Sequence, residues 1–284
     1  MSLPPGNQAR LGPKAAEDDM PPPPSGPASR RGIGLRALLP NAITAAAMCS
    51  GLTGIRFAIA ERWELAVAAI IVAGVLDGID GRIARLLNAQ SRFGAELDSL
   101  ADSLSFGTAP ALVLYLWTLQ DVRLGWFAAL ALAIACALRL ARFNAQIDVD
   151  IQPHKSAGFL TGIPAPVGAG LAFLPFYLWQ VTGIAAFREP MLVGPWVALI
   201  AFLMISNLAT LSWASLRPRR TVRLWVILLV GLMAAAVLLE PWWTLVVICA
   251  GYLATLPIGF VRYARIKRQR AAHAGQQQAP SAHS

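Results

Sequence analysis

The chain has 284 residues, of which 56% are hydrophobic and only 14% are charged. Soluble domains carry about 45–50% apolar and roughly 25% charged residues, so the composition excludes an ordinary soluble protein. It indicates an all-α integral membrane protein, since helices satisfy their own backbone groups in lipid. The formal net charge of +9 does not indicate nucleic-acid binding, because the basic residues cluster at the ends of apolar segments, where they report membrane topology.

Residues 1–35 are rich in proline and polar residues and lack the apolar stretch of a signal peptide. We therefore expect a disordered cytoplasmic tail there. A membrane core is expected at 36–215, a transmembrane hairpin at 216–268 and a second disordered cytoplasmic tail at 269–284. Apolar runs of about 20 residues predict about eight transmembrane helices in the chain, at 39–60, 63–86, 94–118, 123–144, 159–182, 191–214, 222–240 and 242–264.

The basic residues are distributed unequally between the two sides of these spans. One side holds both termini and the loops at 87–93, 145–158 and 215–221. Every Lys and Arg lies on that side except Arg56, Arg62, Arg123 and Arg188. Because cytoplasmic loops carry the excess of Lys and Arg, we expect both termini in the cytoplasm, and we place the chain in a bacterial inner membrane. Five tryptophans at the opposite helix ends are expected to anchor the interface: Trp117, Trp126, Trp179, Trp242 and Trp243.

Four aspartates within the predicted spans are the most informative residues. They follow the pattern D-x-x-D-G-x-x-A-R-x8-G-x-x-x-D-x-x-x-D, from Asp77 to Asp102. An aspartate near the bilayer centre costs about 2.5–3.5 kcal/mol on insertion scales. Four of them therefore predict a functional site rather than packing, and the charge distribution places that site at the cytoplasmic helix ends.

Helical spacing predicts that the aspartates converge. Asp77 and Asp80 share one face of the second span, and Asp98 and Asp102 share one face of the third. A short loop joins the two spans, so the two faces are able to meet. A group of carboxylates without Cys or His suits a hard divalent cation, Mg²⁺ or Mn²⁺, rather than zinc.

The residues between the aspartates suit a diphosphate ligand. Gly81 and Ala84 leave room for a ligand to lie against the helix backbone. Arg85 is a permanent cation that binds phosphate oxygens in a bidentate manner. Metal ions, an arginine and small side chains together predict phosphoryl-transfer chemistry, in which a carboxylate takes the proton of an attacking hydroxyl.

The Asp77–Asp102 pattern resembles the signature of the CDP-alcohol phosphatidyltransferase family, whose members move a substituted phosphate from a CDP-linked donor to an alcohol. The resemblance covers about residues 35–215 and implies a six-helix core, here followed by two C-terminal helices. The runs ELDSLADSLSFG at 96–107, LRLARFN at 138–144 and GFLTGIPAP at 158–166 resemble the branch of the family whose acceptor is serine. The implied substrates are CDP-diacylglycerol and L-serine, and the implied assembly is a homodimer in the lipid bilayer.

The resemblance also implies roles for individual residues. Asp77, Asp80 and Asp98 are expected to bind two divalent ions, with Asp102 as the catalytic base and a further metal ligand. The residues expected to contact the nucleotide or its diphosphate are Gly81, Ala84, Arg85 and Ser91. Capping of the loop is an equally good explanation of Ser91. Asn41 and Thr44 either contact the nucleotide or cap the first helix. For the serine carboxylate we expect Arg142 first, with Asn144 and Arg139 beside it; anchoring of the helix end is the competing explanation.

Two alternatives remain open from the sequence. The first keeps the chemistry and changes the acceptor to glycerol 3-phosphate, inositol phosphate or choline. The second is an ion or proton transporter, because acids within a membrane also serve as proton relays. Broken helices and paired repeats would favour a transporter, and the sequence carries neither strongly.

Overall fold

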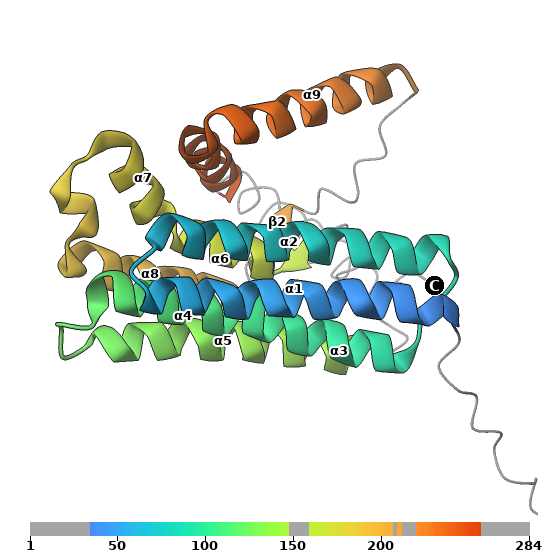
Figure 1. Ribbon diagram of the computed structural model, residues 1–284, viewed down its shortest axis with the longest axis horizontal. Helices are drawn as coiled ribbons and strands as arrows, with labels where there is room; N and C mark the ends of the chain where they lie inside the picture. Colours follow the sequence, from blue (N-terminus) through green and yellow to red (C-terminus); the bar gives the residue numbers. More distant parts are fainter. Residues whose placement is uncertain (1–34, 148–158, 207–208, 212–219, 257–284) are drawn as a thin grey trace, which may run out of the picture. The chain divides into compact units, whose positions relative to one another are not determined.

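The computed structural model describes residues 35–147, 159–206, 209–211 and 220–256. Both expected tails lie outside these ranges, except for Leu35, which begins the first helix. Figure 1 shows a bundle of helices in the described part of the chain, and a buried apolar core runs through it. The helical expectation is therefore confirmed for the described residues, apart from one short two-stranded ribbon.

The first two helices form an antiparallel hairpin. Helix α1 covers Leu35–Ile59 and α2 covers Trp63–Leu86, close to the predicted spans. The turn between them is tight because Glu61 adopts a left-handed conformation with φ of 56°. Helix α1 packs along the length of α2 and also contacts the third span (Figure 1).

The third span is one continuous helical rod with two π-helical segments. It begins with α3 (Arg92–Asp102), passes through the π-helix η1 (Ser103–Thr108) and α4 (Ala109–Leu114), and ends in the π-helix η2 (Tyr115–Leu119). Close packing holds η1 in place. A Cβ atom at Gly51 of α1 would lie 2.9 Å from the Ser105 Cα atom, and one at Gly107 would lie 2.9 Å from the Cys136 Cβ atom.

Helix α5 (Gly125–Ile147) follows and packs against η1 and α8 (Pro190–Ile205). The predicted single span at 159–182 is instead two helices, α6 (Ala165–Ala172) and α7 (Leu174–Thr182). The break falls just before Pro175, which lacks the N–H that would continue the first helix. A short 3₁₀ turn, η4 (Ala185–Arg188), connects α7 to α8.

A two-stranded antiparallel ribbon was not expected from the sequence. It pairs β1 (Phe159–Thr161) with β2 (Ala209–Leu211). The predicted fifth and sixth spans are shorter than expected at these ends, since α6 starts after β1 and α8 stops before β2. Gly162 follows β1 with φ of 76°, a conformation that favours glycine.

Helix α9 (Arg220–Leu239) and the helix Pro241–Leu256 end the described chain. Trp242 stacks on Tyr177 of α7, and the thiol of Cys249 lies 3.7 Å from the Gly170 carbonyl of α6. Two described helices, Leu38–Ile59 and Gly125–Ala145, are long and apolar enough to cross a membrane, and Pro190–Ile205 and Pro241–Leu256 are shorter apolar helices. Many large apolar side chains face outward, as expected of surfaces that lipid covers.

Candidate metal and nucleotide site

Three aspartates converge from two helices. Asp77 lies on α2, and Asp98 and Asp102 lie on α3. One carboxylate oxygen of each residue belongs to a group whose members all lie within 4.8 Å of one another. The predicted meeting of the two helix faces is confirmed for these three residues.

The donors of this three-aspartate cluster fit a divalent cation. All three side chains are half-buried carboxylates, the ligand type that Mg²⁺ and Mn²⁺ prefer. Asp102 Oδ1 is buried and has no hydrogen-bond partner among the described residues. A buried acceptor without a partner is costly unless a cation or another donor satisfies it, so the cluster is suited to hold a metal ion.

Asp80 takes a different position from the other three. It is only 3% exposed, and its Oδ2 atom accepts a hydrogen bond of 2.6 Å from the Thr44 hydroxyl of α1. The group of three carboxylates does not include it. Asp80 lines a pocket together with Asp98, and Asp98 therefore belongs both to the cluster and to the neighbouring hollow.

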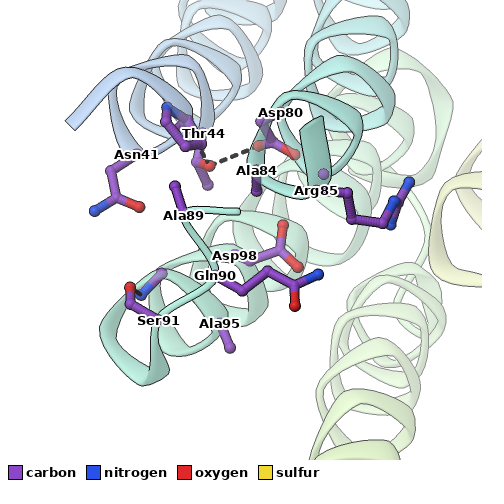
Figure 2. Close-up of a pocket in the computed structure, with 13 residues that line it drawn as sticks. Asn41, Thr44, Asp80, Ala84, Arg85, Ala89, Gln90, Ser91, Ala95 and Asp98 are labelled. Carbon is purple, nitrogen blue, oxygen red and sulfur yellow. Dashed lines mark hydrogen bonds between the residues drawn. The ribbon is translucent and has the colours of Figure 1, made fainter. Parts of the chain in front are cut away.

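That hollow is a pocket of about 330 Å³ between α1, α2 and α3 (Figure 2). The side chains of Asp80 and Asp98 project into it from facing helices. All six residues that the sequence assigned to the nucleotide line this one pocket: Asn41, Thr44, Gly81, Ala84, Arg85 and Ser91. The structure thus brings together residues that are up to 50 positions apart in the chain.

Four further lining residues were missed: Pro40, Ala89, Gln90 and Ala95. Gln90 is an exposed residue of the loop between α2 and α3. No sequence pattern in a polar loop distinguishes one amide side chain from another. Only the three-dimensional path of the loop shows that Gln90 lines the pocket. Ala95 directly follows Gly94 on α3, and both residues line the pocket.

Ser91 caps α3. Its hydroxyl accepts a hydrogen bond of 3.0 Å from the Gly94 backbone N–H, which is the N-cap arrangement. The capping account is therefore confirmed, and the same side chain lines the pocket. Gly94 keeps this corner open, because a Cβ atom there would lie 3.0 Å from Asn41 Oδ1 and 3.1 Å from Ser91 Oγ.

The three residues proposed for the serine carboxylate lie outside the pocket lining. A guanidinium nitrogen of Arg142 donates a hydrogen bond of 3.0 Å to the Ile205 carbonyl at the end of α8. The amide of Asn144 donates one of 2.9 Å to Ser99 Oγ on α3. Arg139 is half-buried, interacts electrostatically with Asp102, and its Nε atom has no hydrogen-bond partner among the described residues.

The sequence of the chain matches models of known protein families. The model of the CDP-alcohol phosphatidyltransferase family matches residues 37–209, and that of CDP-alcohol phosphatidyltransferase 2 matches residues 222–257. The first match contains both the cluster and the pocket.

Several curated proteins with one name are similar to the chain. A CDP-diacylglycerol–serine O-phosphatidyltransferase of Mycobacterium leprae is 39% identical over 234 residues, which cover 82% of this chain and 77% of that protein. The Mycobacterium tuberculosis (strain H37Rv) protein of the same name is 39% identical over 81% of this chain and 80% of its own length. The Bacillus subtilis protein of that name is 33% identical over 60% of this chain and 88% of its own length.

Proposed function

The chain belongs to the CDP-alcohol phosphatidyltransferase family, and from this premise we propose that it transfers the phosphatidyl group of CDP-diacylglycerol to the hydroxyl of L-serine. The products are phosphatidylserine and CMP. One observation carries the proposal: the three-aspartate cluster adjoins a pocket lined by every residue expected at the nucleotide. The names of the similar proteins support serine as the acceptor.

Asp77, Asp98 and Asp102 would hold the divalent cation, Mg²⁺ or Mn²⁺, and two ions remain our expectation. Asp80 would join them only if its bond to Thr44 were exchanged for a bond to metal. A bound divalent cation neutralises the charge of a diphosphate and polarises its phosphorus–oxygen bonds.

The pocket would hold the nucleotide end of the donor. Gly81 and Ala84 present backbone and small side chains on α2, which lets a flat base or ribose lie close to the helix. Arg85 supplies a charge-assisted hydrogen bond to a phosphate oxygen. Asn41 and Gln90 offer amide groups able to pair with polar atoms of the cytidine or ribose.

Asp102 is the proposed general base. Its carboxylate belongs to the three-aspartate cluster, and the oxygen that does not bind the metal would accept the proton of the serine hydroxyl. The serine oxygen attacks the phosphorus that carries the diacylglycerol, the bond from that phosphorus to the CMP oxygen breaks, and CMP leaves. Because the acceptor attacks directly, the chain forms no covalent intermediate.

Arg139 is the better placed of the two arginines for the serine carboxylate. Its Nε atom has no partner within the described chain and it lies near Asp102, whereas Arg142 already donates to the Ile205 carbonyl. An acceptor held at Arg139 would present its hydroxyl near the base. Asn144, which donates to Ser99 on the same helix as Asp102, would fix the spacing between α5 and α3.

The membrane arrangement follows the same premise. We propose about eight spans in the bacterial inner membrane, with both termini and the cluster on the cytoplasmic side, and a homodimer as the assembly. The support is the distribution of Lys and Arg together with the apolar outer faces of the helices.

The test is acceptor-dependent turnover by the purified full-length chain. CDP-diacylglycerol in mixed micelles is incubated with labelled serine, glycerol 3-phosphate, inositol phosphate or choline, each with Mg²⁺ or Mn²⁺. We expect label in lipid and release of CMP with serine alone. Incorporation of label from another acceptor would replace serine in the proposal. If no acceptor led to release of CMP, the proposed activity would be contradicted.

A further inference from the structure

A second cavity lies at the end of the bundle away from the aspartates. It is lined by the turn after α1, by η2, and by the segment from α7 to the start of α8, and its volume is about 510 Å³. Glu61 lines this cavity and Thr44 lines the nucleotide pocket. Fifteen residues of α1 from Thr44 to the helix end at Ile59, at 1.5 Å each, separate the two sites by roughly 22 Å. The tryptophan-lined cavity, as we call it after Trp63, Trp117 and Trp179, has no role in the proposed transfer.

The cavity carries charges of both signs. Glu61, Asp121 and Glu189 are exposed carboxylates of its lining, and Arg188 is its exposed cation. Within the described part of the chain, none of the three carboxylates forms an ion pair with Arg188. Opposite charges that line one cavity without pairing are suited to a ligand that itself carries both charges.

Aromatic rings hold Arg188 in position. Its guanidinium carbon lies 5.4 Å from the ring centre of Trp179 and 6.0 Å from that of Trp117, and one nitrogen donates to the Trp117 carbonyl at 3.4 Å. The Thr118 hydroxyl in turn donates to the Arg188 carbonyl. Cation–π contacts and these hydrogen bonds fix the guanidinium, and its other N–H groups remain for an anion.

Trp117 also offers a donor of its own. Its side chain is 3% exposed, and Nε1 has no hydrogen-bond partner among the described residues. A buried indole N–H normally finds an acceptor. An anionic oxygen in the cavity would provide one beside the guanidinium of Arg188.

The surroundings favour a lipid over a small soluble ligand. A second hollow of about 480 Å³ shares Glu61, Trp63 and Trp179 with the cavity, and its other lining residues are Arg62, Glu64, Leu65 and Gln180. Apolar side chains stand exposed nearby, with Ile59 at 70% and Met191 at 81%. Tryptophans at helix ends belong to the level of lipid headgroups, so acyl chains would cover these apolar residues.

We propose that the tryptophan-lined cavity binds the zwitterionic headgroup of a membrane phospholipid, with its phosphate at Arg188 and Trp117 and its ammonium group at the carboxylates. Phosphatidylethanolamine is the matching chemistry, since phosphatidylglycerol lacks the ammonium group. The site is separate from the transfer reaction and belongs to the opposite membrane face.

Native mass spectrometry of the full-length chain tests the proposal. The chain in mild detergent is titrated with phosphatidylethanolamine, phosphatidylglycerol or O-phosphoethanolamine, the soluble headgroup alone. We expect phosphatidylethanolamine to bind at least about tenfold tighter than phosphatidylglycerol. Equal affinity for the two lipids would overturn the proposal, and tight binding of O-phosphoethanolamine alone would replace the lipid with a soluble ligand.

Substitutions locate the binding. Arg188→Gln is expected to weaken phosphatidylethanolamine about tenfold, because a charge-assisted hydrogen bond is lost. Asp121→Asn, which removes an exposed carboxylate with little risk to folding, should reduce the preference for phosphatidylethanolamine over phosphatidylglycerol. Arg123→Gln is the matched control, because Arg123 is an exposed arginine of the same end outside the cavity lining.

An equal effect of Arg123→Gln would overturn the assignment of the site. Serine transfer by each variant is measured in parallel and should stay within about twofold of the unsubstituted chain, because the two sites are roughly 22 Å apart. Loss of lipid preference with full transfer activity supports this site alone. Absence of transfer in every form would instead contradict the proposed function and leave the lipid-binding result intact.

Discussion

The Thr44 hydroxyl donates a hydrogen bond of 2.6 Å to Asp80 Oδ2, which ties α1 to the aspartate motif of α2. Asp80 is 3% exposed, so its carboxylate depends on this bond more than an exposed acid would. The bond also sets one wall of the nucleotide pocket, since both residues line it.

Thr44→Val should therefore affect both stability and donor binding. The substitution keeps the shape and leaves a buried carboxylate oxygen without its partner, which costs about 1–3 kcal/mol. We expect a lower Tm and a higher KM for CDP-diacylglycerol. Thr53→Val is the control on the same helix, because the Thr53 hydroxyl donates its hydrogen bond within α1, to the Cys49 carbonyl. Equal losses from both variants would contradict a specific role for the Thr44–Asp80 bond.

Asp102→Asn should stop transfer while weakening donor binding far less, because Asp77 and Asp98 remain as metal ligands. The amide cannot accept the serine proton, and loss of a general base lowers kcat by about 10²–10⁴-fold. Turnover is measured with labelled serine, and donor binding by calorimetry with CDP and Mg²⁺. Glu96→Gln, an exposed carboxylate of the same helix, should retain activity. Full turnover by Asp102→Asn would refute the assignment of the base.

Metal binding should stabilise the fold in a way that depends on the cluster. A ligand at 100 times its Kd adds about 2.7 kcal/mol to the stability of the native state, so Mg²⁺ or Mn²⁺ should raise the Tm of the chain. Chelation should remove both the rise in Tm and the activity. Asp77→Asn should abolish the rise, whereas Asp121→Asn, remote from the cluster, should keep it. A metal-induced rise that survives in Asp77→Asn would place the ion elsewhere.

Substitution of the two arginines of α5 should affect different quantities, the KM for serine in one case and the Tm in the other. Arg139→Gln is expected to raise the KM for serine at least about tenfold, since a charge-assisted bond to its carboxylate is lost, with the KM for CDP-diacylglycerol little changed. Arg142→Gln should instead lower the Tm, because it removes the bond to the Ile205 carbonyl. The opposite pattern would restore Arg142 as the serine ligand.

Local spacing was sufficient to predict the cluster. Asp98 and Asp102 are four residues apart, and a helix places such residues on one face whatever surrounds it. The loop between α2 and α3 is short enough that Asp77 had to come near them. The pocket residues on α2 followed from the same periodicity, and Asn41 and Thr44 came from the resemblance.

Tertiary contacts account for what the sequence did not predict. The pairing of Asp80 with Thr44 depends on how α1 is rotated about its own axis. Close packing of small residues such as Gly51 against η1 determines that rotation. The ribbon joins residues 159–161 to 209–211, and no local pattern identifies a partner about 50 positions away. The hydrogen bond from Arg142 to the Ile205 carbonyl likewise depends on where α8 ends.

The π-helical segments of the third span set the angular phase between its two ends. Each wide turn takes in one extra residue, and one residue corresponds to about 100° of rotation on a helix. Asp98 and Asp102 precede η1, whereas Trp117 and Thr118 lie within η2 at the other end. Deletion of a single residue within Ser103–Thr108 would thus leave the carboxylates in register and turn the tryptophan away from Arg188. The number of residues in this segment therefore determines how the two ends of the third span are rotated relative to each other.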